Sequence, residues 1–289
     1  MPLNLRSGKV LVTIFVTTSL KGYMMKLTIG CTTRPYSAVS FAEACDHIAA
    51  AGYTDVAVFA NLGKIPVRSD STDGEIAATC KAAVDAGLVP SMLIGGSKLE
   101  LGLDTAVDDF KKLIDNAAKL GAKWLLNCGT SNKEHFSIYY ELMRRTAPYA
   151  EQAGVNITLK PHGGITLTID DLIKAYNEVN HPAFGICYDP GNIIYYTKGE
   201  LRPEPDIARV APTVTTGIIK DCVVEDGKPD VMVTPGEGLV DFEKVLGGLV
   251  KSGFRGPLYV ECVGGKELEE INKNVKSTLK FVSDILAKL

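Results

Sequence analysis

The residues of this chain that could carry chemistry follow two apolar segments about 30 residues apart. Lys160 and His162 lie in Lys-Pro-His-Gly-Gly, and Asp189 and Asn192 lie in Asp-Pro-Gly-Asn. An ammonium, an imidazole and a carboxylate in such positions suit proton transfer or metal binding. Both apolar segments have the composition of β-strands, so the chemistry depends on which of these side chains face one cavity.

Four further residues follow apolar runs or glycine-rich turns. Lys220 ends one run, Arg34 follows the first run, and Glu237 lies in Pro-Gly-Glu-Gly. Glu261 comes directly after Leu-Tyr-Val, where a carboxylate is costly to bury without a partner. Glu261 therefore needs a metal, a basic group or a hydrogen-bonding ligand, and a salt bridge to Lys160 is the simplest alternative.

Structural roles compete with functional ones at several of these residues. Asp189 precedes Pro-Gly-Asn and has the composition of a turn former. Among the four histidines, His162 lies beside two glycines and within reach of two carboxylates, whereas His135 is a weaker candidate. His47 and His181 are expected to be structural.

Short apolar runs alternate with longer helical patterns eight times from residue 26 onward. The expected strands are residues 27–31, 54–59, 89–94, 123–128, 156–160, 184–189, 214–220 and 257–262. The expected helices are residues 39–51, 74–86, 106–120, 135–153, 170–179, 205–210, 241–252 and 266–289. Glycines occupy the helix ends, where a left-handed residue is favoured, at Gly52, Gly87, Gly121, Gly154 and Gly253.

Eight units of about 33 residues predict an α/β fold, a single-domain (β/α)8 TIM barrel. In such a barrel the loops at the carboxyl ends of the strands converge, which places the candidate residues at one mouth. A doubly wound open sheet is the alternative. It is disfavoured as a dinucleotide-binding fold, because Cys-Thr-Thr-Arg-Pro follows the first expected strand in place of a glycine-rich turn.

Composition indicates which classes of ligand and which cellular compartment to expect. The net charge of −3 and the pI of about 5.9 provide no basic field for nucleic acid or an anionic membrane, so we expect a small neutral or weakly charged ligand. Seven cysteines without CxxC spacing are expected to be buried, reduced thiols, which suits the cytoplasm. Residues 1–24 resemble a signal peptide diluted by polar residues, and we expect a disordered or non-native extension before a domain of residues 25–289.

Four motifs in order resemble the xylose isomerase-like superfamily of TIM barrels, which contains sugar-phosphate isomerases and epimerases. They are Asp-Pro-Gly-Asn, Ile-Lys-Asp ending at residue 221, Gly-Glu-Gly-x-x-Asp-Phe ending at residue 242, and Tyr-Val-Glu ending at residue 261. The resemblance covers nearly everything after Met25. It implies isomerisation, epimerisation, dehydration or elimination of sugars by movement of a proton next to a carbonyl.

The resemblance also implies a divalent ion, often manganese, held at the barrel mouth by Glu, Asp, His and Glu from the last four strands. Asp189 and Glu261 match this set. The position of the first glutamate falls on Lys160, and that of the histidine falls on Ile218. A glutamate common in the second strand is replaced by Ala57.

Two arrangements can accommodate these departures. In the first, which we favour, His162 joins Asp189 and Glu261 around Mn²⁺, Zn²⁺ or Fe²⁺, because the three otherwise have no reason to converge. In the second, the site is free of metal and the ammonium of Lys160 replaces the ion and pairs with both carboxylates.

These arrangements predict an isomerase or epimerase that acts on a carbohydrate, with Lys160 and Glu261 as catalytic residues. Arg34, Asn192, Lys220 and Glu237 are expected to contact the substrate. A lyase or hydratase acting on an oxidised, keto glycoside is the second possibility, and a non-catalytic sugar-binding barrel or enzyme subunit is the third. A homodimer is expected from the resemblance.

Overall fold

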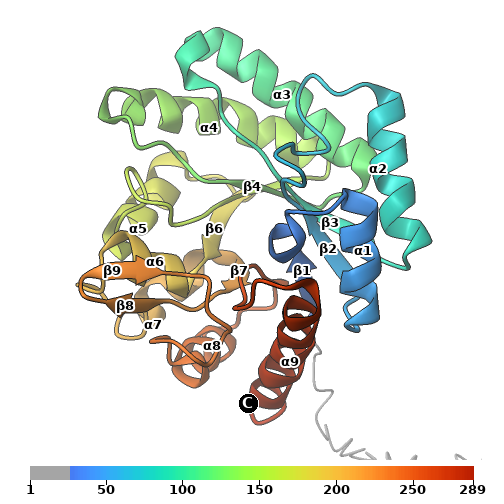
Figure 1. Cartoon of the computed structure of the whole chain (residues 1–289). Helices are drawn as coiled ribbons and strands as arrows, with labels where there is room; N and C mark the ends of the chain where they lie inside the picture. The colour runs from blue at the N-terminus through green and yellow to red at the C-terminus, as the bar shows by residue number, and fades with distance from the viewer. Residues whose placement is uncertain (1–26) are drawn as a thin grey trace, which may run out of the picture.

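A closed parallel barrel of eight strands forms the centre of the computed structural model, which describes residues 27–289 (Figure 1). The order around the barrel is β1-β10-β7-β6-β5-β4-β3-β2. The strands are β1 (Ile29–Thr32), β2 (Asp55–Val58), β3 (Val89–Ile94), β4 (Trp124–Asn127), β5 (Asn156–Leu159), β6 (Phe184–Tyr188), β7 (Val214–Ile219) and β10 (Leu258–Val260). The predicted barrel and its eight strands are confirmed. The expected extension of residues 1–24 lies outside the described residues.

Helices follow the barrel strands and surround them (Figure 1). They are α1 (Phe41–Ala50), α2 (Asp73–Asp85), α3 (Leu103–Leu120), α4 (Phe136–Gln152), α5 (Ile169–Val179), α7 (Ile207–Val210), α8 (Phe242–Lys251) and α9 (Leu268–Leu286). The five glycines expected at helix ends all have a positive φ angle, between 70° and 101°. Each allows the chain to leave a helix and enter the next strand without steric strain.

The barrel interior is built in layers by the alternation of side chains along each strand. An inner apolar cluster contains Ala57, Cys187, Ile218 and Tyr259 among other buried residues. The inward-facing positions two residues further along β5, β6, β7 and β10 carry polar groups at the carboxyl ends of the strands. A layer of ionisable side chains thus lies directly on an apolar one.

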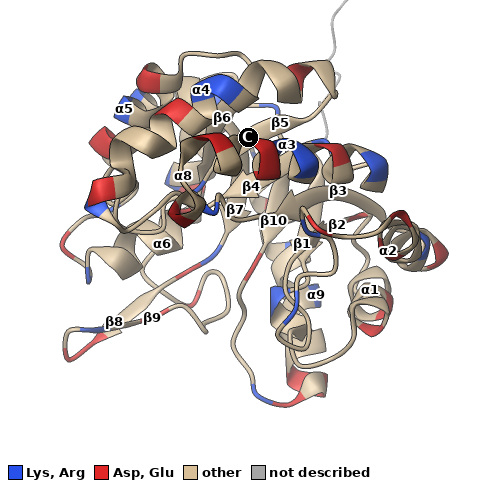
Figure 2. Cartoon of the chain, turned by 90° about the horizontal axis from the view of Figure 1, so that it is seen from above, with Lys and Arg blue, Asp and Glu red and all other residues tan. Residues whose placement is uncertain are grey.

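Three elements interrupt the simple repeat after β6 and β7. Asp189 caps the amino end of α6 (Pro190–Tyr196), where Pro190 occupies the first helical position. After β7, the strands β8 (Val223–Glu225) and β9 (Lys228–Asp230) form an antiparallel hairpin that projects from the barrel (Figure 2). The sequence pattern did not predict these elements, because each is shorter than the windows in which periodicity can be recognised.

Lysine and arginine alternate with aspartate and glutamate along the outer helices (Figure 2). No helix within residues 27–289 is both long enough and apolar enough to cross a membrane. All seven cysteines are free thiols, and five of them are buried. Cys80 and Cys128 are partly exposed, which corrects the expectation that every thiol is buried.

Candidate active site

Four charged side chains from neighbouring strands meet at the carboxyl end of the barrel: Lys160, Asp189, Lys220 and Glu261, here called the ionic quartet. The Nζ atoms of Lys160 and Lys220 lie 3.1 and 3.2 Å from Oδ2 of Asp189. Both ammonium groups also donate hydrogen bonds to Glu261, one to each carboxylate oxygen. None of the four residues is more than 6% exposed. The quartet therefore buries two positive and two negative charges that balance each other.

Helix α6 fixes one side of the quartet. The backbone N–H of Asn192 donates to Oδ1 of Asp189 over 3.0 Å, so the carboxylate serves as helix cap and ion-pair partner at once. The Asn192 side chain accepts from Lys220 over 3.2 Å and donates to the carbonyl of Pro161 over 2.8 Å. Both ends of the Asn192 amide are therefore occupied within the protein.

Asp-Pro-Gly-Asn contains glycine because α6 approaches β7 closely. A Cβ atom on Gly191 would lie 2.7 Å from the carbonyl oxygen of Lys220 and 2.8 Å from its Cγ. No side chain fits there without displacing the lysine. The motif predicted from the sequence as a turn former thus both caps a helix and leaves room for a buried ammonium.

Burial and charge act in opposite directions on the pKa values of the quartet. Burial raises the pKa of Glu261, but the ammonium groups of Lys160 and Lys220 outweigh it and lower the pKa to about 2. Burial lowers the pKa of Lys160, yet the carboxylates of Glu261 and Asp189 raise it well above its ordinary value. Both groups are therefore charged throughout the neutral range, and the carboxylate of Glu261 is a weak base.

The residues of the quartet do not fit a divalent ion. Oδ2 of Asp189 accepts no well-aligned hydrogen bond, but it already faces two ammonium groups. A protonated lysine has no lone pair for a metal, and two such groups repel a dication. Within residues 27–289, no three His, Cys, Asp or Glu side chains are arranged to hold a metal ion.

Two of the three positions at which the sequence departs from the set implied by the resemblance belong to the apolar layer. Ile218 and Ala57 are fully or almost fully buried in the inner cluster beneath the quartet. His162 would have to replace the missing nitrogen ligand, but the structure does not join it to Asp189 and Glu261 in a ligand cluster. The assignment of these three residues to a metal therefore stays a prediction from the sequence, and the geometry favours the metal-free alternative.

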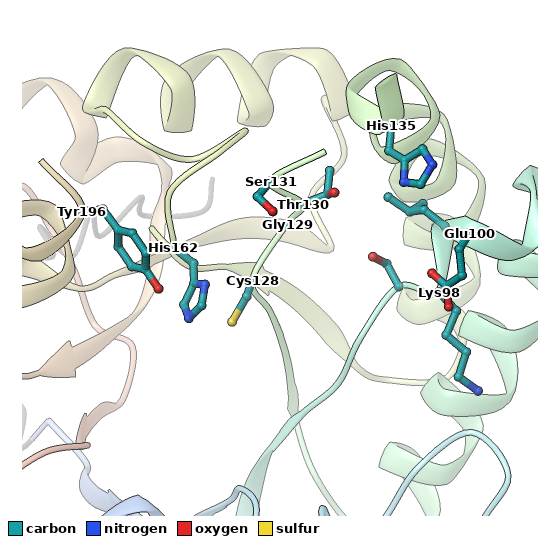
Figure 3. Close-up of a pocket in the computed structure, with 11 residues that line it drawn as sticks. Lys98, Glu100, Cys128, Gly129, Thr130, Ser131, His135, His162 and Tyr196 are labelled. Carbon is teal, nitrogen blue, oxygen red and sulfur yellow. The ribbon is translucent and has the colours of Figure 1, made fainter. Parts of the chain in front are cut away.

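A cavity of about 540 Å³ opens beside the quartet (Figure 3). Its inner end is formed by Cys128 after β4, His162 after β5 and Tyr196 at the end of α6. The His162 and Tyr196 rings have their centroids 4.9 Å apart. Figure 3 shows the imidazole between the Tyr196 ring and the Cys128 thiol. No member of the quartet is among the residues that line this cavity.

His162 is held at the cavity by its backbone, and its side chain is partly exposed to solvent. Its N–H donates to the hydroxyl of Thr166 over 2.9 Å. Gly164 has a φ angle of +54°, and a Cβ atom there would lie 2.4 Å from the carbonyl oxygen of Thr130. The two glycines after His162 thus let the β4 and β5 loops pack together. Burial, followed by the charges of Lys160 and Lys220, lowers the pKa of His162, so its imidazole is neutral at pH 7.

Two residues expected to contact the substrate lie away from this cavity. Arg34 begins a short 3-10 helix after β1 and is exposed. Glu237 is exposed in the loop of residues 233–240. The buried carboxylate of Asp221 orders that loop, because it accepts hydrogen bonds from the backbone N–H groups of Gly236, Gly238 and Val240 at 2.9 Å each. The structure therefore assigns Asp221 a structural role and brings neither Arg34 nor Glu237 to the cavity.

The sequence did not predict the roles of three residues at this site. Lys220 was expected to bind substrate, but it is the second ammonium of the quartet. Tyr196 and Cys128 were not candidates, although Cys128 lies at the end of an expected strand. That position was the available signal for Cys128, whereas Tyr196 lies in a helix that the sequence pattern did not predict.

A family model described as xylose isomerase-like TIM barrel matches residues 45–285. No curated protein sequence matches the chain.

Solved structures share the fold at low sequence identity. A xylose isomerase-like TIM barrel protein from Mycobacterium smegmatis, in complex with magnesium, is 17% identical with a TM-score of 0.73, covering 91% of this chain and 99% of that one. D-psicose 3-epimerase from Clostridium cellulolyticum H10, with D-tagatose, is 14% identical with a TM-score of 0.72, covering 90% and 99%. A xylose isomerase domain protein from Planctomyces limnophilus is 22% identical with a TM-score of 0.67, covering 84% and 92%. At these identities the likeness concerns the fold alone.

Proposed function

The chain belongs to the family of xylose isomerase-like TIM barrels, and from this premise we propose that it is an enzyme that moves a proton beside the carbonyl group of a sugar or sugar derivative. The ionic quartet carries this proposal. It places two buried ammonium groups behind the cavity wall, where their electrostatic field favours negative charge that develops on a substrate oxygen. One structure of similar fold is D-psicose 3-epimerase with D-tagatose, which supports ketoses as the first compounds to test.

The proposed reaction begins with proton abstraction by the neutral imidazole of His162. The electron pair of the broken C–H bond forms the double bond of an enediol, and the carbonyl oxygen gains negative charge. The ammonium groups of Lys160 and Lys220 do not line the cavity, and they favour this negative charge through their electrostatic field. His162 then returns the proton to the neighbouring carbon while the hydroxyl proton passes to the former carbonyl oxygen, which completes an isomerisation without gain or loss of atoms.

His162 is a better base than Glu261 in this site. A general base works best when its pKa lies near the working pH, and a carboxylate with a pKa of about 2 is far below it. Glu261 instead holds the two ammonium groups in place. A single base on one face of the substrate favours isomerisation over epimerisation, because the proton returns to the face from which it left.

No divalent ion takes part in this proposal, because the positive charge comes from Lys160 and Lys220. The expected manganese, zinc or iron has no ligand set in the described residues, and the two ammonium groups supply the electrostatic role instead. Turnover is therefore expected to withstand prolonged dialysis against EDTA.

Solvent exchange tests the proposal directly. The protein is incubated in D2O with D-fructose, D-psicose or D-tagatose, and loss of the C–H signal beside the carbonyl is followed by proton NMR. We expect exchange in the wild type, with or without EDTA, and its loss in His162→Ala and Lys160→Met. His181→Ala is the matched control, because His181 lies before β6 at the opposite end of the barrel. Solvent exchange that requires an added metal ion would contradict the proposed mechanism.

A non-catalytic sugar-binding barrel is the second candidate. The closed charge balance of the quartet and the low pKa of Glu261 favour it, since both are also expected of a purely structural ion cluster. Ligand binding without solvent exchange for any sugar would support this candidate. The lyase alternative begins with the same proton abstraction, and release of an alcohol from a keto glycoside distinguishes it from isomerisation.

A further inference from the structure

The cavity continues well beyond the barrel mouth, away from His162 and Tyr196. Its outer end lies between the loops that follow β3 and β4 and is lined by Ser97, Glu100 and His135, with Ser131 between the two ends. Figure 3 shows His135 and Glu100 at the far side of the cavity from Tyr196. The cavity therefore has two separate groups of polar side chains.

The size of the cavity exceeds what one sugar ring needs. Its volume of about 540 Å³ lies within the range for drug-sized ligands, roughly 300–1,000 Å³. With one hexose over His162, the polar side chains at the outer end remain available to a second unit. The side chains at the outer end offer hydroxyl, carboxylate and imidazole groups, which pair well with sugar hydroxyls.

Charge at the outer end argues against a phosphate. Lys98 is the one lysine or arginine among the described residues lining the cavity, and its ammonium is already bound. It donates to Asp109 Oδ1 and to Ser69 Oγ, each over 2.8 Å. Glu100 adds an exposed carboxylate that repels an anion. The outer end thus suits a neutral, hydroxyl-rich group.

We propose that the substrate is a neutral glycoside of at least two sugar units. The unit that bears the carbonyl lies over His162, and the second ring contacts Glu100, His135 and Ser131 at the outer end of the cavity. This inference builds on the proposed function by naming its substrate class. It excludes a free monosaccharide and a sugar phosphate as the preferred ligand.

Binding tests this inference without relying on turnover. Isothermal titration compares turanose, maltulose and isomaltulose, three glucosyl-fructoses of different linkage, with D-fructose and D-fructose 6-phosphate. At least one disaccharide is expected to bind about tenfold or more tightly than D-fructose, because the outer residues add hydrogen bonds to a charged group. The phosphorylated ketose is expected to bind no better than D-fructose.

Variants at the outer end show where the second ring binds. Glu100→Ala and His135→Ala are expected to weaken disaccharide binding about tenfold and to leave D-fructose binding unchanged. Glu134→Ala is the matched control, because Glu134 is exposed beside His135 and does not line the cavity. Equal affinity for the disaccharides and D-fructose, preference for the phosphate, or variants that weaken both ligands alike would overturn the inference.

The two proposals fail in different ways. Solvent exchange on D-fructose without any preference for disaccharides contradicts the glycoside inference and keeps the proposed function. Preferential disaccharide binding without exchange in any bound ketose contradicts the proposed function and keeps the inference.

Discussion

Each residue of the ionic quartet contacts two members of opposite charge. Lys160 and Lys220 each contact both Asp189 and Glu261, so no member has a single partner. Buried ion pairs gain little over apolar packing, but loss of one member leaves an uncompensated charge that costs several kcal/mol. Charge balance, rather than any one pair, stabilises the site.

We expect Lys220→Met to lower the free energy of unfolding by about 3–5 kcal/mol, because it leaves two carboxylates with one ammonium. The double variant Lys220→Met with Glu261→Gln restores neutrality and should lose less than the sum of the two single variants. Guanidinium unfolding of the four proteins measures this coupling. Strict additivity would show that the quartet is not a unit.

The lysines also determine which ligands the carboxylates can take. Replacing both ammonium groups with oxygen donors, in Lys160→Glu with Lys220→Gln, surrounds one point with oxygen ligands that suit Mn²⁺. We expect this double variant to bind Mn²⁺ and the wild type not to do so, as measured by electron paramagnetic resonance of free Mn²⁺. Lys220→Gln alone is the control. Stoichiometric Mn²⁺ on the wild-type protein would refute the metal-free site.

The pKa of His162, at the cavity, depends on the charges of Lys160 and Lys220. Burial and both ammonium groups lower it from 6.5, so the neutral base persists as the pH falls and protonates only below that value. Lys160→Met removes a positive charge, so the pKa of His162 should rise. NMR titration of the His162 ring protons measures the shift, and an unchanged pKa would contradict the electrostatic account.

At the scale of elements, Asp221 links β7 to the loop of residues 233–240. Its carboxylate accepts four backbone N–H groups, including that of Cys222 at 2.8 Å. A Cβ atom on Gly238 would lie 2.4 Å from Oδ1 of Asp221, so the glycine is needed for the approach. Of the consecutive residues Lys220 and Asp221, the first therefore belongs to the ionic quartet in the barrel and the second orders the loop.

Removal of this carboxylate should loosen the loop and spare the barrel. Asp221→Ala leaves four backbone N–H groups without this partner, and the two buried ones, of Cys222 and Val240, each cost about 1–3 kcal/mol before the loop relaxes. We expect faster hydrogen exchange at Gly236, Gly238 and Val240, measured by NMR or mass spectrometry. Glu225→Ala, on the exposed hairpin, is the control. Protection that matches the wild type would show that the loop is held by other contacts.

Sequence reasoning succeeded where a pattern repeats and failed where tertiary contacts decide. The eight strands follow from periodicity, and the strand 89–94 matches β3 at both ends. Lys160, Asp189 and Glu261 were brought together by the barrel topology and by the resemblance. The role of Lys220 could not be predicted from the sequence, because it depends on the spatial arrangement of four charged side chains. Helix α6 and the β8–β9 hairpin were too short to show a period.

For the whole molecule, the quartet makes the free energy of unfolding decrease at acidic pH. The pKa of Glu261 is lowered from 4.5 to about 2, so the folded state favours its charged form. This contribution is complete above pH 4.5 and is lost as the pH falls from 4.5 toward 2. Urea midpoints measured across that range should decline less steeply in Lys220→Met with Glu261→Gln than in the wild type. Parallel declines would place the acid sensitivity elsewhere in the chain.

The apolar layer beneath the quartet has a consequence for how such a barrel can change over generations. A metal set with the imidazole ligand that the resemblance implies would require a new residue at Ile218 in addition to those at Lys160 and Lys220. Any first step leaves a buried charge unpaired or places a polar ring among apolar side chains, at a cost of several kcal/mol. Each intermediate along a path of single substitutions is therefore less stable than both ends. Stability therefore disfavours the conversion of the quartet into a metal site by single substitutions.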